Sequence, residues 1–521
     1  MSLNTVNEIR KKVLSLATAI GLGLLFLYQH RNFFHDDTYI TLRYVQQFLG
    51  GNGIVWNTGE TVEGYTNFLF LLLVSLIGST GLDLVLATRL VNVTALVLTA
   101  LLVACIAGHR GWLFGLPAAF VLGSAPLAIW SMGGMEAPFL GLLGTAGAGM
   151  FLRARESGFD LRPLGLSALI LALAVLARPD GLIFVVVSLA FLLHYRQTWK
   201  QVLLFLGVIT LVLVPYLVWK WGYYGSLVPN TFYAKSAAAL EIERMWYASK
   251  YLANHAKRPP FLFLWVLVAL GYLWRRKAFN GGHAYLLSMA GAYIAYVIWV
   301  GADHMPGHRF VVPVIPLLAA FVFRAIPPAP GLLEAWKLLA LHSLSAVLLA
   351  FQIPALEERT KRPDPAAFVG RIIGGYIAEN WPTGSSVALN TAGSIPYYSP
   401  GNSYIDMLGL NDRQIARRPV ADRGLPWQKI PGHRKGDGAY VLSREPDYII
   451  AGPAQGASID QPYFLSDLEM AEDPRFERMY TREQIQIDVR RFAGYRHYLA
   501  TRTGALEFTY YRRRVQDVPT E

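Results

Sequence analysis

The sequence predicts an α-helical polytopic membrane protein that ends in a soluble α/β domain. Of its 521 residues, 54% are hydrophobic and only 16% are charged, whereas soluble proteins carry about 25% charged residues. Apolar runs recur from Val13 to about Phe351, while residues 352–521 have the charge, Pro and Gly content of a soluble domain. We therefore predict a membrane domain over residues 1–351 and an α/β domain over residues 352–521.

The first apolar run follows the basic residues Arg10, Lys11 and Lys12 and extends to about Tyr28. No small-residue cleavage site follows it, so we expect a retained anchor with a cytoplasmic N-terminus. Further apolar runs start near Leu84, Trp112, Pro138, Leu164, Gly181, Gln201, Phe261, Ala284, Phe310 and Leu333. Several are shorter than the roughly 20 residues of a full helical crossing. Together they predict about eleven transmembrane helices, an odd number that places the C-terminal domain outside.

The apolar stretch Phe68–Ile77 is too short to span a bilayer, so we expect it to lie along the interface or to re-enter. When this stretch is left out of the count of spans, the loops that contain the basic residues near Arg110, Arg153, Arg196 and Arg275 lie in the cytoplasm, as the positive-inside rule requires. Topology of this kind accounts for the net charge of +12 better than nucleic-acid binding does. With one cysteine, Cys105, no intramolecular disulfide can form.

The outer loop over residues 31–83 begins with two adjacent carboxylates, Asp36 and Asp37, directly after the first span. Ionisable groups at this depth are costly and mostly functional, although an interfacial pair that simply faces water is an equal alternative. The loop continues with turn-rich, aromatic and polar segments that contain Glu63, Tyr65 and Asn67 and suit a sugar site.

The other predicted outer loops are short and carry polar residues at the ends of apolar spans. These residues are Glu136, Arg178, Asn230, Tyr233, Lys235, Asp303, His304, His308 and Arg309. Each alone reads more readily as a helix cap or a snorkelling charge. On one face of a bundle, however, they indicate a general base beside an anion-binding pocket.

Asp303, His304 and His308 also offer ligands for a metal ion. Pro306 and Gly307 disfavour a regular helix between the histidines, so phosphate contact by His308 and Arg309 is the preferred interpretation. The sequence contains no Gly-x-x-x-x-Gly-Lys loop, no His-Glu-x-x-His and no Gly-x-Ser-x-Gly motif. An activated donor must therefore come from the membrane, and a lipid phosphate fits that requirement.

Several segments resemble the C-type, polyprenyl-phosphate-sugar-dependent glycosyltransferases, above all the terminal arabinofuranosyltransferases of mycobacterial cell-wall assembly. They are the segments 36–44 (DDTYITLRY), 53–57 (GIVWN), 62–67 (VEGYTN), 134–136 (GME), 178–181 (RPDG), 224–231 (YGSLVPNT), 303–310 (DHMPGHRF) and 406–412 (DMLGLND). The resemblance covers most of the chain. It implies the fold of that superfamily and an inverting transfer of a sugar, D-arabinofuranose, from a polyprenyl phosphate to an acceptor hydroxyl.

The resemblance also implies roles for individual residues. The general base maps onto Asp36 or Asp37, with Asp36 slightly favoured, and the donor phosphate onto Lys235 and Arg309, with Arg178 and His308 as second choices. Residues expected to orient sugars or to brace the loops are Glu63, Tyr65, Asn67, Glu136, Asn230, Tyr233, Asp303 and His304. A divalent cation aids the reaction in some members of the superfamily, but the sequence does not decide this, and we predict no defined metal ligands and no required cofactor.

The expected partners are a polyprenyl-phosphate-linked sugar, a glycan, lipid-linked glycan or protein acceptor, and membrane lipid, at the outer face of the bacterial inner membrane. The C-terminal domain is shorter than is usual in the family named. Its predicted strands include Ser386–Leu389 and Tyr448–Ala451, and its aromatic residues Trp381, Tyr397, Tyr398, Tyr404 and Trp427 either bind acceptor glycan or, more often in such domains, form the core. Two rival functions are a transporter or flippase, for which we see no internal repeat, and an inactive glycan-binding scaffold, which would need neither aspartate.

Overall fold

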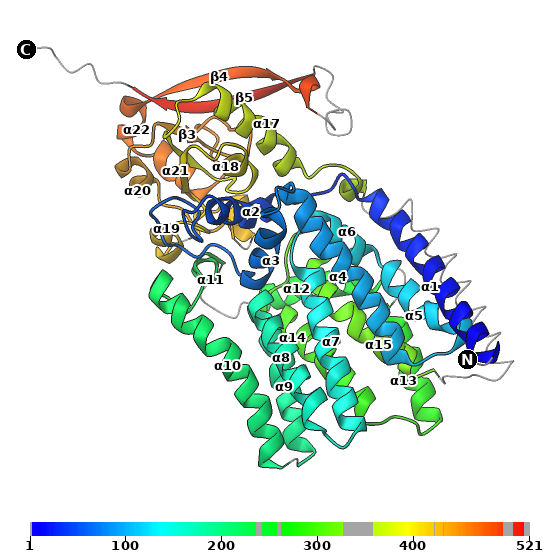
Figure 1. Cartoon of the computed structure of the whole chain (residues 1–521). Helices are drawn as coiled ribbons and strands as arrows, with labels where there is room; N and C mark the ends of the chain where they lie inside the picture. The colour runs from blue at the N-terminus through cyan, green and yellow to red at the C-terminus, as the bar shows by residue number, and fades with distance from the viewer. Residues whose placement is uncertain are drawn as a thin grey trace, which may run out of the picture.

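The computed structural model describes residues 3–196, 198–235, 242–257, 262–326, 358–420, 422–430, 432–492 and 504–514. Within them the chain forms a helical bundle, with an α/β part at one end of it (Figure 1). The helices of the bundle and its loops are α1 (Leu3–Gln29), α2 (Asp36–Leu49), α3 (Phe68–Gly78), α4 (Leu84–Ala107), α5 (Gly115–Leu122), α6 (Ala125–Gly133), α7 (Ala137–Glu156), α8 (Leu161–Ala177), α9 (Leu182–His194), α10 (Trp199–Tyr224), α11 (Asn230–Lys235), α12 (Ile242–Ala256), α13 (Leu262–Arg275), α14 (Gly281–Val300) and α15 (Ile315–Arg324). Short 3₁₀ turns occur at Gly111–Phe114, Pro179–Gly181 and Arg309–Val314.

Four helices in the described part of the chain are long and apolar enough to cross a membrane, namely α1, α4, α10 and α14, and the bent pair α5 and α6 makes a fifth candidate. Shorter apolar helices are α3, α8, α13 and the segment Pro179–His194. The predicted number of about eleven spans stays a prediction. The predicted run from Leu333 and the domain boundary at 351/352 lie outside the described residues.

The apolar run that begins near Trp112 is not one straight helix. It is divided at Gly123 and Ser124 into α5 and α6, whose axes differ by 58°. Pro126 lies in the first turn of α6, where it needs no backbone hydrogen-bond donor. The short break therefore turns the chain without leaving a proline inside a helix.

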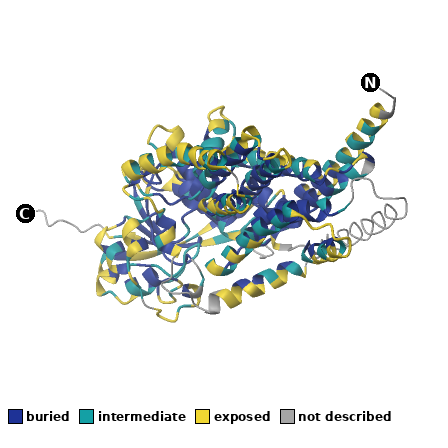
Figure 2. Cartoon of the chain, turned by 90° about the horizontal axis from the view of Figure 1, so that it is seen from below, coloured by how far each residue is buried: buried dark blue, intermediate teal, exposed yellow. Residues whose placement is uncertain are grey.

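The outward faces of the bundle are apolar, as expected for helices that contact lipid. Leu211 of α10 is 74% exposed and Trp274 of α13 is 80% exposed, and Figure 2 shows exposed residues along the outer helices around a buried centre. A large exposed apolar surface of this kind marks a contact with membrane or protein. These helices, together with the buried core they surround, make the chain a multi-pass membrane protein.

The α/β part contains a five-stranded sheet with the strand order β2-β1-β3-β5-β4. The strands are β1 (Ser386–Leu389), β2 (Ser403–Asp406), β3 (Tyr448–Ile450), β4 (Tyr480–Asp488) and β5 (Ala505–Arg513), and the helices are α17 (Pro365–Asn380), α18 (Ser394–Tyr398), α19 (Arg413–Arg417), α20 (Gly438–Ser443), α21 (Leu465–Ala471) and α22 (Pro474–Met479). The first three strands are parallel, and β5 pairs antiparallel with β3 and β4. The two predicted strands are thus confirmed, the second one residue shorter than expected.

Most of the predicted aromatic residues of this part form its core. Trp381 is buried and stacks on Tyr448 with ring centroids 3.7 Å apart, and Tyr404 is buried beside Trp56. Trp427 is the exception, because it is 39% exposed. Core packing therefore accounts for Trp381 and Tyr404, and Trp427 alone of these three presents its ring to solvent.

Helix α2 joins the α/β part to the bundle. Its buried Arg43 donates hydrogen bonds to the carbonyl oxygens of Trp56 (2.7 Å), Asn402 (3.0 Å) and Pro396. Tyr44, one residue further on, donates to the carbonyl oxygen of Val62. In Figure 1, α2 accordingly lies directly beneath the sheet domain, at the end of the bundle where the predicted outer loops meet.

Candidate active site

A cavity of about 2380 Å³ lies where the bundle meets the α/β part. Side chains of the first outer loop, of α8, α11 and α14, of residues 301–310 and of residues 390–392 all line it. All the predicted site residues line this cavity except Asn230 and Tyr233. The structure therefore brings together residues that the sequence distributes over five loops.

Asp36 opens α2 and is held by the α/β part. Its carboxylate oxygen Oδ1 accepts hydrogen bonds from the backbone N–H (2.9 Å) and the hydroxyl (2.5 Å) of Ser394. No hydrogen bond from the described residues reaches Oδ2. Burial raises the pKa of Asp36 to about 6, although the bonds from Ser394 oppose the shift, and the charges of Asp364 and Asp37 add to it. Asp36 is thus a firmly oriented carboxylate with one oxygen left for a ligand.

The close approach of Asp36 to the loop before Ser394 needs a glycine. A Cβ atom on Gly393 would lie 2.2 Å from the carbonyl oxygen of Asp36 and 2.5 Å from its Oδ2. Atoms at that separation overlap, so only glycine fits this position.

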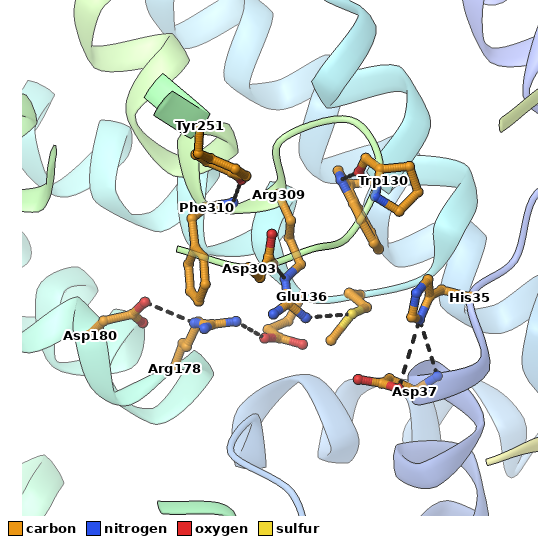
Figure 3. A network of polar contacts seen from close by, with 12 residues as sticks. His35, Asp37, Trp130, Glu136, Arg178, Asp180, Tyr251, Asp303, Arg309 and Phe310 are labelled. Carbon is orange, nitrogen blue, oxygen red and sulfur yellow. Dashed lines mark hydrogen bonds and ion pairs between the residues drawn. The ribbon is translucent and has the colours of Figure 1, made fainter. Parts of the chain in front are cut away.

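Asp37 has different surroundings. Its backbone N–H donates to His35 Nδ1 at 3.2 Å, which caps α2 (Figure 3). Burial favours the protonated form, but the positive charges of His35, Lys235 and Arg309 outweigh it and lower the pKa of Asp37. Asp37 is therefore an ionised carboxylate on the cationic side of the cavity.

A chain of ion pairs joins the ends of α7 and α8. Arg178 donates to Glu136 Oε1 at 2.6 Å and to Asp180 Oδ2 at 2.8 Å (Figure 3). Asn67 donates to the other Glu136 oxygen at 3.0 Å. Burial raises the pKa of Glu136, but the charges of Arg178 and Arg309 lower it below the ordinary value. Arg178 is thus already committed to two carboxylates, and Glu136 and Asn67 brace it.

Residues 301–309 form a tight loop that carries Arg309. Four of its residues have positive φ: Gly301, Ala302, Gly307 and His308. Arg309 Nε lies 2.9 Å from Asp303 Oδ2, and its guanidinium also contacts Met135 (Figure 3). Non-glycine residues in the left-handed region are held at a cost by the structure around them and cluster at functional sites. Here they direct Arg309 toward the centre of the cavity.

Lys235 is the last residue of the short helix α11 and, unlike Arg178 and Arg309, pairs with no carboxylate among the described residues. Its ammonium group makes no hydrogen bond or ion pair with any described residue, although the charge of Asp37 acts on it. Burial lowers the pKa of Lys235, with Arg309 and Arg178 acting in the same direction. By contrast, Lys220 pairs with Glu63 at 2.8 Å. Lys235 is thus a cation available to an anionic ligand.

Glu63 and Tyr65 belong to a braced wall of the cavity. Burial raises the pKa of Glu63 to about 7, and Lys220 opposes this shift. The Tyr65 hydroxyl lies 3.0 Å from that of Tyr224. Both side chains line the cavity while their polar ends are engaged within the protein, so they shape the wall more than they offer free groups.

Asn230 and Tyr233 lie behind the cavity wall. The Asn230 amide donates to the carbonyl oxygens of Gly409, Leu410 and Asp412 at 2.9 to 3.1 Å. The guanidinium carbon of Arg417 lies over the ring of Tyr233, 4.8 Å from the ring centroid. Asn230 therefore braces α11 against the α/β part. Of the two roles predicted for it, orienting a sugar or bracing a loop, this contact corresponds to the second.

The three residues that offered an alternative metal site make other contacts. Asp303 pairs with Arg309, and the ring of His308 lies 4.8 Å from that of Tyr251. The ring of His304 packs against His433 at 5.5 Å. No group of three or more His, Cys, Asp or Glu side chains arranged to hold a metal ion occurs among the residues described.

Sequence reasoning missed two residues that complete the site, Ser394 and Lys220. Ser394 lies 358 residues from Asp36, and nothing in its local sequence marks it. Lys220 is inside an apolar run, where a charge signals a buried partner. That signal identifies Lys220 but not Glu63 as its partner.

Two comparisons concern the sequence. The α/β part, over residues 361–506, matches a family described as a domain of unknown function, DUF8728. The chain is 28% identical over 330 residues to a terminal β-(1→2)-arabinofuranosyltransferase of Mycobacterium tuberculosis, covering 56% of this chain and 52% of the relative. It is 27% identical over 328 residues to the protein of the same name from Corynebacterium glutamicum, covering 55% of this chain and 47% of the relative. The chain thus spans about half the length of the curated relatives it matches.

The fold also matches a solved structure. ArnT from Cupriavidus metallidurans, bound to undecaprenyl phosphate, superposes with a TM-score of 0.54 at 14% identity, covering 75% of this chain and 85% of ArnT. The resemblance predicted from the motifs is confirmed. This chain is a polytopic membrane protein with the C-type glycosyltransferase fold and a C-terminal α/β part, similar in sequence to terminal arabinofuranosyltransferases.

Proposed function

We propose that this protein is an inverting glycosyltransferase that moves a sugar, D-arabinofuranose, from a polyprenyl-phosphate donor to a hydroxyl of a glycan or glycoconjugate. One observation carries the proposal. One cavity contains an oriented carboxylate of raised pKa, Asp36, and a cation, Lys235, that makes no hydrogen bond or ion pair with any described residue. The choice of sugar follows the names of the curated relatives, and the choice of a lipid phosphate follows the ligand of ArnT.

Asp36 suits the general base better than Asp37 does. A base with a pKa near the working pH is more effective than one of low pKa, and the pKa of Asp36 is about 6 whereas that of Asp37 is lowered. In an inverting displacement, the base and the leaving group lie on opposite faces of the sugar. The charges acting on Asp37 come from the cations, whereas those acting on Asp36 come from Asp364 and Asp37 itself. This supports Asp36 as the base on the side away from the phosphate.

The proposed step is a single displacement. The acceptor oxygen attacks the anomeric carbon while its proton passes to Asp36 Oδ2. The bond from the anomeric carbon to the phosphate oxygen breaks, and its electron pair stays on the phosphate. Positive charge placed where negative charge develops lowers the barrier. Lys235 meets this charge directly, and Arg309 does so from the tight loop, with Arg178 and His308 behind them.

The proposed function also requires that the site open on one particular side of the membrane. We propose that the cavity faces the outer side of the bacterial inner membrane, with the N-terminus in the cytoplasm and the α/β part outside. The Lys and Arg residues in the predicted cytoplasmic loops support this orientation.

The test uses the purified full chain in nanodiscs with a synthetic polyprenyl-phosphoryl-D-arabinofuranose and a panel of short glycans. Wild-type protein is expected to form a glycoside of inverted anomeric configuration, and Asp36→Asn is expected to lose transfer while keeping its thermal unfolding profile. Asp160→Asn is the matched control, because this exposed carboxylate makes no capping hydrogen bond on α8.

The outcomes separate the alternatives. Release of polyprenyl phosphate without a glycoside keeps the donor and requires another acceptor. If the lipid neither reacts nor binds, the glycosyltransferase proposal is wrong. Movement of the intact lipid across the bilayer without transfer would instead support the transporter alternative.

A further inference from the structure

The α/β part contributes a face of the cavity that the proposed chemistry does not use. The described residues on this face include Asn390, Ala392, Trp427, His433 and Phe464. None of these five side chains is an acid or a permanent cation, although Arg359, Arg362 and Asp364 of the α/β part also line the cavity. The face adjoins the cationic side, because a Cβ on Gly432 would lie 3.5 Å from Lys235 Cε and the ring of His433 packs against His304.

Asn390 follows directly after β1, at the carboxyl end of a central parallel strand. Its neighbours β2 and β3 lie on either side of β1, so the chain connections diverge at this point. In open α/β sheets, ligands bind in the crevice outside the carboxyl ends of the strands where the connections diverge. Here that crevice opens into the cavity.

The Asn390 side chain has one unused polar atom. Its Nδ2 donates to the Gly452 carbonyl oxygen at 3.2 Å and to Asp467 Oδ1 at 3.1 Å. Its Oδ1 is buried and has no hydrogen-bond partner among the described residues. Burying an oxygen without a partner is unfavourable, and the orientation of the amide is fixed by Asp467. A ligand that donates a hydrogen bond from the cavity would satisfy this oxygen.

Trp427 supplies an apolar surface in the same cavity. Its ring centroid lies 6.0 Å from that of Phe464 and 5.9 Å from that of His433. The Phe464 backbone N–H in turn donates to Asp467 Oδ2 at 3.1 Å, so the carboxylate that fixes Asn390 also fixes the aromatic group. One small unit thus combines a free hydrogen-bond acceptor with a broad aromatic face, which suits the hydroxyls and the C–H face of a sugar ring.

The same loop connects this unit to the base. Residues 390–394 run from Asn390 to Ser394, which binds Asp36 Oδ1. A sugar held at Asn390 and Trp427 would therefore lie along the loop that orients Asp36, in the cavity that also contains the cations.

We infer that Asn390 and Trp427 form a binding subsite for a sugar ring of the acceptor glycan, with Asn390 Oδ1 accepting a hydrogen bond from a hydroxyl and the indole stacking on the ring. That the bound sugar belongs to an acceptor rests on the proposed function, whereas the sugar-binding subsite itself does not. It assigns the α/β part to acceptor recognition and the bundle to the donor.

The experiment measures both binding and kinetics on the full chain in nanodiscs. Saturation-transfer NMR detects binding of a short arabinan oligosaccharide in the absence of donor. Asn390→Ala and Trp427→Ala are each expected to raise the acceptor Kd and the acceptor KM about tenfold, as the loss of one buried polar or aromatic contact implies. The donor KM should not change, and Trp427→Phe should restore most of the acceptor affinity.

Tyr463→Ala is the matched control. Tyr463 is 38% exposed and contacts Phe464 just as Trp427 does, but it does not line the cavity. Acceptor binding that is equal in wild type, Asn390→Ala and Trp427→Ala would overturn the inference, and so would an equal loss in Tyr463→Ala. Wild-type protein that binds the oligosaccharide but transfers nothing would contradict the proposed function and leave the subsite standing.

Discussion

The two carboxylates at the start of α2 are neighbours in sequence, yet different parts of the chain determine their chemistry. Ser394 of the α/β part holds Asp36, and the charges of His35, Lys235 and Arg309 act on Asp37. The pKa of Asp36 is therefore raised and that of Asp37 lowered. Two titratable groups with opposite shifts are typical of a site that separates proton transfer from charge stabilisation.

The pH dependence of transfer tests the role of Asp36. A general base works only when ionised, so kcat/KM for wild type is expected to fall as the pH drops below about 6. The hydrogen bonds from Ser394 favour the carboxylate, so Ser394→Ala should raise the pKa of Asp36 and move the acidic limb to higher pH. Ser399→Ala, which removes a buried hydroxyl that does not contact Asp36, should leave the limb in place. An unchanged limb in Ser394→Ala would exclude Asp36 as the titrating base.

Lys235 is the residue for a test of donor binding. Hydrogen bonds to charged groups contribute roughly 1.5–3 kcal/mol, so Lys235→Ala is expected to raise the donor KM about tenfold or more without loss of stability. Removal of the Lys235 side chain leaves no described residue without its ion-pair partner. Arg309→Ala, by contrast, would leave the buried Asp303 without its ion-pair partner, so its effect on donor binding would be harder to interpret. The exposed Lys200, at the start of α10, provides the control variant Lys200→Ala. A donor KM that stays at the wild-type value would remove Lys235 from the phosphate site.

At the scale of elements, α2 is the part that locks the α/β part onto the bundle. It has both the buried Arg43 and the site residues Asp36 and Asp37. Its first turn contacts α18, and Arg43 binds a carbonyl oxygen of that helix, at Pro396, and one of the loop after it, at Asn402. An element that carries the base on one turn and the anchor two turns later transmits any movement of the α/β part to the base.

Removal of the Arg43 anchor tests this coupling. Arg43→Met keeps an unbranched apolar stem but leaves three carbonyl oxygens without their donor. We expect a loss of at least about 3 kcal/mol of stability, measured as a lower thermal unfolding midpoint in nanodiscs, together with faster proteolysis of the α/β part. The control Arg475→Met, at an exposed ion pair, should change stability by less than about 0.5 kcal/mol. Equal midpoints for the two variants would contradict the anchoring role.

At the scale of the whole molecule, the features that depend on local sequence were predictable and those that depend on long-range contacts were not. The apolar runs predicted the helices, and two short runs between turns predicted β1 and β3, whose residues are almost all buried. Of the fourteen residues predicted for the site, twelve line the cavity, because most of the motifs that contain them lie at the end of an apolar run. The bond between Asp36 and Ser394 and the pairing of Lys220 with Glu63 could not be predicted, since a contact between distant segments leaves no signal in one sequence. The break between α5 and α6 was not predicted, although Gly123, Ser124 and Pro126 are residues typical of the end of one helix and the start of the next.

The predicted topology can be tested in a cysteine-free background. Cys105 is the one cysteine of the sequence, so Cys105→Ser leaves a chain without thiols. Asp460→Cys, in the exposed surface of the α/β part, should react with a membrane-impermeant maleimide added to intact cells. Ser157→Cys, at the end of α7, should react only after the cells are opened. The reverse pattern would invert the proposed orientation.

The distance between Arg43 and its acceptor at Pro396, 353 residues along the chain, has a consequence for biosynthesis. Chains grow at about 5–20 residues per second, so α2 waits roughly 20–70 s after its own synthesis for the segment that buries it. In the proposed orientation, its guanidinium and both aspartates would face water on the trans side of the membrane during that interval, exposed to proteases. Quality control that removes unprotected segments would therefore eliminate chains stalled before residue 396, and the proposed transfer would begin only after that residue has been synthesised.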